Sequence, residues 1–266
     1  MSADKFGKIL HSQKLKNIAI KTAVAALWLV LWQLVCMAVN MELLVVSPAA
    51  VARRLLALGQ TAEFWSDSLR SLGRITEGFL FGSVTGALLA VICRRYAFAR
   101  AFFSPAVTVI KSTPVASFII LALVWLTGQH VPVFIAFLMV LPVVYANVYQ
   151  GIGEVDPKLL EMVAVYRMSR LQKVSKIYIP SILPYFMAAC RTALGMAWKA
   201  GVAAEVIGVT KDSIGRKLYY SKIYLETVDL FAWTVTVIIM SLLLEKCFVW
   251  AVDRLSRKLH LTRRDK

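Results

Sequence analysis

The chain has 266 residues, is 59% hydrophobic and carries a formal net charge of +16. Its mean hydropathy is +0.68, and apolar runs of about 20 residues recur, long enough to cross the ~30 Å hydrocarbon core of a bilayer as helices. This composition excludes an ordinary soluble domain and predicts an all-α, polytopic bundle of about six transmembrane helices. Because the basic residues flank the apolar runs, we attribute the charge to orientation and to contact with membrane lipid, with no nucleic-acid partner.

The beginning of the chain predicts a cytoplasmic tail followed by a retained membrane span. Residues 1–17 are rich in lysine and precede an apolar run over 18–39. This run is too long for the core of a signal peptide, so we expect the tail to stay inside the cell and the run to span the membrane. An amphipathic helix is expected after Pro48, at the outer surface or packed on the bundle.

The second span is expected over 75–93 and contains three glycines at four-residue spacing. Gly78, Gly82 and Gly86 form a row of small residues that lets two helices approach closely in lipid. Packing within this chain is the favoured interpretation, and an interface between subunits remains the alternative.

The remaining spans follow from the alternation of apolar runs and basic segments. Lys111 lies early in the third span and is expected to snorkel to the inner surface. Residues 208–229 are polar and are expected to form an outer loop, and the basic end of the chain puts the C-terminus inside. A single transmembrane domain is thus expected over 18–266, with its later spans at 105–127, 131–149, 185–207 and 230–252 and a basic cytoplasmic loop over 150–184.

A basic stripe in the fifth span predicts a charged path. Arg191, Gly195 and Lys199 stand at i, i+4 and i+8 and so share one helix face. A charge facing lipid costs at least ~2.5 kcal/mol, so Lys199 should face the bundle interior or a wet cavity. We hypothesise that Lys199 and Arg191 line a translocation path that favours an anion, with Glu205 on the outer turn pairing across helices. The alternative is a structural lysine that pairs with a carboxylate or snorkels outward.

The loop over 150–184 has the capping signals of two short helices. Asp156 and Pro157 suit the N-cap and first position of one helix, and Ser169 with Gln172 forms a capping-box pattern that begins another. Pro180 is expected to end the second helix. An ordinary helical hairpin remains an alternative to a docking surface.

The same loop resembles the EAA loop of inner-membrane permeases in binding-protein-dependent ABC importers. The resemblance is carried by the residues Asp156, Pro157, Glu161, Ala164, Ser169, Ile177, Pro180 and Pro184. The order of the segments 71–74 and 203–208 is similar to the aliphatic sulfonate, taurine and nitrate branch. Arg167 stands where the family has glycine, and arginine in a left-handed turn costs on the order of 1 kcal/mol.

The resemblance implies a permease that works with other proteins in the inner membrane of the cell. Its partners would be a cytoplasmic ATP-binding subunit, an external solute-binding protein and a second permease copy, forming a homodimer. The residues that would couple to the ATPase are Asp156, Pro157, Leu160, Glu161, Ala164, Arg167, Ser169 and Pro180. The solute would be small and anionic, as in sulfonate, taurine or nitrate uptake, and a thiamine-precursor-like solute is the alternative.

Other classes of function lack their sequence signals. The chain has no G-x-x-x-x-G-K-[ST] phosphate loop, HExxH or GxSxG motif, so we expect no catalysis and no cofactor, with ATP bound by the partner subunit. Its cysteines and histidines have no metal spacing, so no metal site is expected. A secondary transporter driven by an ion gradient remains an alternative, although neither internal repeats nor a mid-span carboxylate pair supports it.

Overall fold

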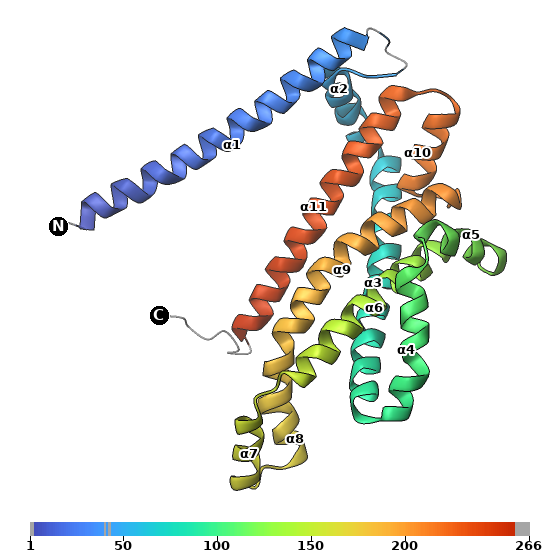
Figure 1. The fold of residues 1–266 in the computed structure, drawn as a ribbon. Coiled ribbons are helices and arrows are strands. Elements are labelled where there is room, and N and C mark those ends of the chain that lie inside the picture. The colour runs from blue at the N-terminus through green and yellow to red at the C-terminus, as the bar shows by residue number, and fades with distance from the viewer. Residues whose placement is uncertain (1–2, 40, 42–43, 259–266) are drawn as a thin grey trace.

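The computed structural model describes residues 3–39, 41 and 44–258, and the secondary structure of these residues is entirely helical (Figure 1). This confirms the all-α class. The helices are α1 (Ala3–Val39), α2 (Pro48–Gly59), α3 (Ala62–Arg95), α4 (Ala97–Ser112), α5 (Val115–Trp125), α6 (Val131–Gly153), α7 (Pro157–Val165), α8 (Arg170–Lys173), a π-helix (Val174–Tyr178), α9 (Ile179–Ile207), α10 (Ile214–Ile223) and α11 (Thr227–Lys258).

Five helical segments of the described chain are long and apolar enough to cross a membrane, or six if α4 and α5 together make one span. Figure 1 shows α3, α6, α9 and α11 packed as the bundle, with α7 and α8 projecting from one end. At the other end, Ser47 caps the expected amphipathic helix α2 by accepting a hydrogen bond from the Ala50 amide. The α2 helix lies there beside the start of α11, where Val51 packs with Ala232.

The contact between α3 and α6 depends on the glycine row predicted from the sequence. A Cβ added at Gly78 would lie 2.2 Å from the carbonyl oxygen of Val133, and one added at Gly86 would lie 2.7 Å from that of Leu141. At Gly82 the nearest atom would also belong to α6, at 2.8 Å. The row therefore serves packing within this chain, as the favoured interpretation held.

The core continues from α3 and α6 onto α9. Ile75, Val144 and Trp198 are almost completely buried in one cluster of side chains. The indole Nε1 of Trp198 donates a hydrogen bond of 3.0 Å to the backbone oxygen of Val237, which ties α9 to α11. A buried indole needs such a partner, because an unpaired polar group in an apolar core is costly.

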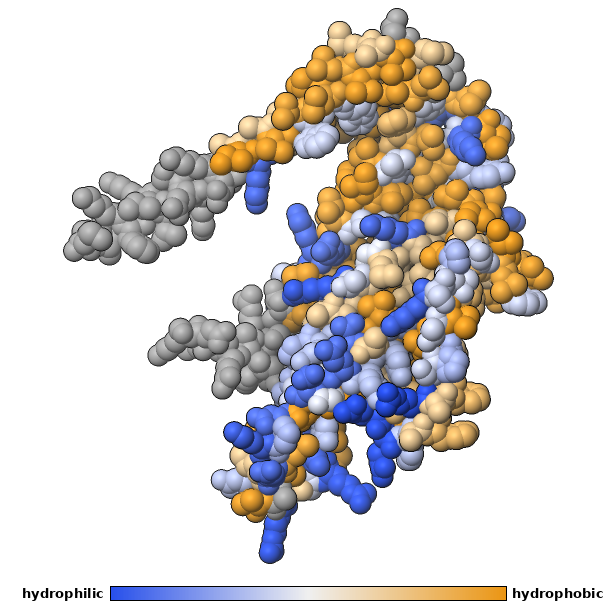
Figure 2. Space-filling model, viewed as in Figure 1, coloured by the Kyte–Doolittle hydropathy of each residue, from blue (hydrophilic) through white to orange (hydrophobic). Residues whose placement is uncertain are grey.

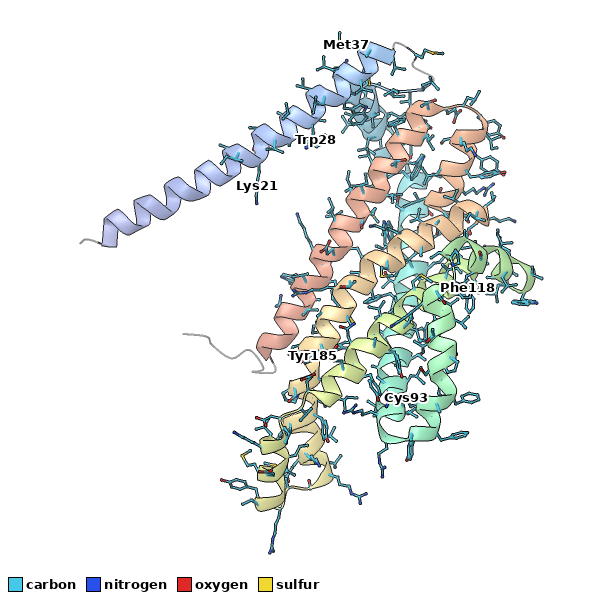
Figure 3. The ribbon with its side chains drawn as sticks, in the orientation of Figure 1. Lys21, Trp28, Met37, Cys93, Phe118 and Tyr185 are labelled. Atoms are coloured by element: carbon cyan, nitrogen blue, oxygen red, sulfur yellow. The ribbon has the colours of Figure 1, made fainter. Side chains whose placement is uncertain are left out.

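The first helix stands apart from this core. Its apolar part, Ala19–Val39, is not buried against the rest of the chain, and Figure 3 shows Lys21 and Trp28 on an arm separated from α11 by open space. Trp32, nearer the end of α1, stacks on Phe231 with ring centroids 6.0 Å apart. The bundle contact of α1 is thus made near its C-terminal end.

The expected third span at 105–127 is wrong as a single helix. The α4 and α5 helices meet at an angle of 109°. Thr113 has ψ 132° and precedes Pro114. Proline disfavours the helical conformation at the residue before it, which explains the break at this position.

Two further expectations need correction. The outer loop over 208–229 contains α10, whose N-cap Ser213 accepts a hydrogen bond of 3.0 Å from the Arg216 amide. Pro180 does not end a helix: it lies in the first turn of α9, directly after the π-helix, and Pro184 is inside α9. The helical segment is continuous over Arg170–Ile207, so Pro180 removes one backbone hydrogen bond from it, and the π-helix lies just before the proline.

Candidate functional site

The hairpin of α7 and α8 begins with the cap that the sequence predicts. The Oδ1 atom of Asp156 accepts a hydrogen bond of 2.8 Å from the Lys158 amide, and Pro157 is the first residue of α7. Ser169 and Gln172 form the expected capping box at α8, with the Ser169 amide donating to Gln172 Oε1 at 2.9 Å. The start of each short helix is therefore fixed by its own residues.

The turn between the two helices is left-handed at Arg167, which has φ 47°. The amide of Met168 donates to the carbonyl oxygen of Val163 at 3.1 Å, which is the Schellman pattern of a helix C-terminus. Val163 and Met168 also pack together with Val155 and Ile177. Arginine thus takes the conformation that glycine takes more easily, at a cost on the order of 1 kcal/mol.

The hairpin presents apolar side chains to its surroundings. Val165 is 79% exposed and Leu171 is 83% exposed, the largest values among the hydrophobic residues of the hairpin. We call the exposed residues Leu159, Met162, Val165, Tyr166 and Leu171 the hairpin surface. Exposed apolar residues gathered on a projecting element indicate a surface that contacts another protein or the membrane.

The other predicted coupling residues lie around this surface. Glu161 is exposed on α7, whereas Leu160 is partly buried against the small core beneath the hairpin. Pro180 is partly buried at the start of α9. Ala164 lies in α7, and its side chain is outside the described part of the chain.

The basic stripe of α9 faces outward from this chain, so it does not face the interior of the bundle formed by one chain, the first of the two surroundings expected for it; a wet cavity, the second, stays a prediction. Arg191 and Lys199 are exposed, and a Cβ added at Gly195 would meet no atom within 4 Å. The opposite face of α9 is buried, with Ala193 and Ala197 at zero exposure. Among the described residues, no carboxylate lies within ion-pair distance of Lys199.

Glu205 does not share that open face. It has zero exposure, and its Oε2 atom accepts hydrogen bonds from Ser71 Oγ at 2.8 Å and from the Gly215 amide at 3.3 Å. Its Oε1 atom lies 3.6 Å from Arg74 Nη1. The expected pairing across helices is therefore present, but Glu205 lies inside the junction of α3, α9 and α10.

Arg74 and Ser71 are the residues of this junction whose role sequence reasoning missed. Arg74 donates to the carbonyl oxygens of Lys211 and Asp212, each at 3.1 Å, and Ser71 Oγ also accepts from the Ile214 amide at 3.0 Å. In the sequence, the segments 71–74 and 203–208 are recognisable only by their order along the chain. Their spacing of over a hundred residues gave no signal that they meet.

A bundle of long apolar helices with a capped helical hairpin projecting from one end defines a polytopic helical membrane protein. The chain belongs to the family described as binding-protein-dependent transport system inner membrane component, which matches residues 81–261. This confirms the resemblance to ABC importer permeases.

Individual relatives agree with the family. A probable ABC transporter permease of Brucella melitensis is 26% identical, covering 79% of this chain and 85% of its own. A putative aliphatic sulfonates transport permease of Bacillus subtilis is 24% identical, covering 82% and 78%, and the nitrate import permease of Synechococcus elongatus is 29% identical, covering 52% and 50%. The crystal structure of an amino acid ABC transporter has a TM-score of 0.60 at 17% identity, covering 77% of this chain and 97% of that one.

Proposed function

We propose that this importer permease moves a small anionic solute between two copies of the chain, driven by a separate ATPase that docks on the hairpin surface. The observation that carries the proposal is the exposed, charged face of α9, formed by Arg191, Gly195 and Lys199, in a chain whose long helices are apolar. The family supplies the class of binding-protein-dependent transport.

The α9 face supports both the second copy and the anion. A lysine facing hydrocarbon is costly, and Lys199 has no carboxylate partner among the described residues, so it needs water or a partner chain in front of it. A path between two copies of the chain, lined by α9 of each copy, would place both water and a partner chain in front of Lys199. The two relatives named for the transport of aliphatic sulfonates and of nitrate both carry the name of an anion, which agrees with a basic path.

The hairpin supports the ATPase contact. Figure 2 shows hydrophilic surface concentrated around the end of the molecule that carries α7 and α8, as expected for the cytoplasmic side. The short capped helices hold the hairpin surface rigid, so that movement of a bound ATPase can be passed through the π-helix to α9. In this arrangement both termini are cytoplasmic, and α10 at the opposite end faces the external solute-binding protein.

Replacing Val165 and Leu171 together by serine is expected to weaken co-purification of the ATP-binding subunit at least about tenfold, since central apolar contacts carry most of an interface's energy. The test is affinity purification of the tagged chain from its own membranes in mild detergent, with ATPase activity measured in the eluate. Leu56→Ser with Leu225→Ser is the matched control, because both leucines are exposed at the other end of the molecule, at 71% and 69%.

Undiminished ATPase recovery with the hairpin variant would contradict docking on this surface. A wild-type chain that purifies without any ATPase, yet moves solute in vesicles under an ion gradient alone, would replace the importer by a secondary transporter.

Lys199→Met is expected to lower the uptake rate by at least about tenfold, because a charge-assisted contact to an anion contributes roughly 1.5–3 kcal/mol. Uptake of labelled taurine, an alkanesulfonate and nitrate is measured in cells that express equal amounts of each variant. Lys199→Arg should retain most activity, and Lys246→Met, which removes an exposed charge from α11, should have little effect. Unchanged uptake by Lys199→Met at normal expression would remove Lys199 from the path.

A further inference from the structure

Two arginines share one aromatic ring at the end of the bundle that carries the hairpin. Arg94 lies in the last turn of α3 and Arg100 lies in the first turn of α4. Their guanidinium carbons lie 5.2 Å and 5.5 Å from the centroid of the Tyr149 ring. Cation–π contacts of this length are worth ~0.5–1 kcal/mol each at exposed sites, and they hold both cations in place before any ligand arrives.

Three arginines bring positive charge to this turn, and among the described residues they have no ion-pair partner. Arg94, Arg95 and Arg100 are all exposed, and none of them forms an ion pair with a carboxylate in the described part of the chain. Nearby like charges repel one another, so the turn is stabilised by any anion that binds between them. Arginine suits a phosphate in particular, because its planar fork offers paired donors.

Apolar surface lies directly beside these charges. Phe98 is 83% exposed and Phe102 is 67% exposed, and their rings stack with centroids 6.4 Å apart. On α3, in the turns before Arg94, Leu88 and Val91 are 58% and 51% exposed. Figure 3 places Cys93, the residue before Arg94, at the lower end of α3 where α4 begins. The turn therefore joins an anion-binding group to a surface that suits acyl chains.

The geometry points to a binding site for an anionic phospholipid of the inner leaflet, with its phosphate between Arg94 and Arg100 and its acyl chains along Phe98 and Phe102. An acidic surface of the ATPase would satisfy the arginines but not the two exposed phenylalanines. A phospholipid satisfies both, and it is present wherever this chain is embedded in a membrane.

The site lies at the base of the hairpin. Tyr149 stands in the last turns of α6, which ends at Gly153, and a Cβ added at Gly153 would lie 3.0 Å from Arg94 Nη2. Three residues separate that helix end from α7. Bound lipid thus fixes the end of α6 next to the hairpin and so positions the hairpin. This effect on the hairpin rests on the proposed function, whereas lipid binding itself does not.

The test is native mass spectrometry of the purified chain, titrated in detergent with dioleoylphosphatidylglycerol or dioleoylphosphatidylcholine. Wild type is expected to retain phosphatidylglycerol in preference, and the double variant R94Q/R100Q to bind it about 30-fold more weakly, since each basic residue near a lipid surface contributes about 1 kcal/mol. The control R53Q/K222Q removes the same charge from exposed residues elsewhere and should bind like wild type.

A second pair of variants separates the site from general charge. Tyr149→Phe keeps the ring and should retain lipid, whereas Tyr149→Leu removes the surface that holds both guanidiniums and should weaken binding about fivefold. Equal binding of phosphatidylglycerol by wild type and R94Q/R100Q would overturn the proposal, as would equal retention of the two lipids by wild type. Because no ATPase or solute is present, a failure here is distinct from a failure of the importer mechanism.

Discussion

Glu205→Ala is expected to lower the free energy of unfolding by about 3–5 kcal/mol, the range for removing one partner of a buried ion pair. The substitution leaves Ser71 Oγ and the Gly215 amide without their acceptor and leaves Arg74, whose side chain is only 15% exposed, without its carboxylate. It also opens a cavity at a position with zero exposure. Thermal unfolding in detergent, followed by tryptophan fluorescence, measures the loss.

The control for this prediction is Glu77→Ala, which removes an exposed carboxylate from α3, three residues after Arg74. It should change stability by less than ~0.5 kcal/mol, as surface substitutions away from special features do. The free energy of unfolding of Glu205→Gln should lie between those of Glu205→Ala and Glu77→Ala, because the amide keeps the shape and one acceptor oxygen but loses the charge facing Arg74. If Glu205→Ala unfolded at the same temperature as the Glu77→Ala control, the junction of α3, α9 and α10 would not depend on the Glu205 side chain.

The local features of the fold were predictable because their causes are local. Asp156 and Pro157, and the pair Ser169 and Gln172, satisfy backbone groups within a few residues, so their sequence is sufficient to place helix starts. The positive φ expected from the glycine position of the family is found at Arg167. Long apolar runs likewise identify membrane helices from composition alone.

What the sequence could not give are the contacts between distant segments and the direction of a helix face. The spacing of Ser71, Arg74 and Glu205 in the sequence does not show that they are in contact. Which residues of two packed helices face each other depends on how the helices are aligned in the bundle, and the spacing does not reveal that alignment. The sequence correctly predicts that the basic residues of α9 share one face. The cost of burying a charge in hydrocarbon excludes only a face turned to lipid, and it does not distinguish the interior of one chain from a surface between two chains. The bend at Pro114 was missed because residues 105–127 together have the length and composition of one span, although the polar residues Lys111, Ser112 and Thr113 interrupt the apolar run there.

Gly78→Ala is expected to destabilise the bundle by about 3 kcal/mol, the upper end of the cost of overpacking. The new Cβ would lie 2.2 Å from the backbone oxygen of Val133 and 2.8 Å from the Cβ of Ala136. Neither atom belongs to a flexible side chain, so α3 and α6 must move apart along a contact that Gly82 and Gly86 also hold close. The consequence reaches beyond one site, since separating these helices weakens dispersion contacts along the row.

The control lies one and a half turns away on the same helix. A Cβ at Gly73 would meet nothing within 4 Å, so Gly73→Ala should stabilise α3 by roughly 0.5–1 kcal/mol through the loss of glycine's backbone freedom. The same glycine-to-alanine substitution should thus lower the free energy of unfolding at Gly78 and raise it at Gly73. Thermal unfolding of both variants in one detergent measures this difference. If Gly78→Ala were as stable as Gly73→Ala, close approach of α3 and α6 would not be what the glycine row provides. Helix propensity would then be the only remaining effect of these glycines.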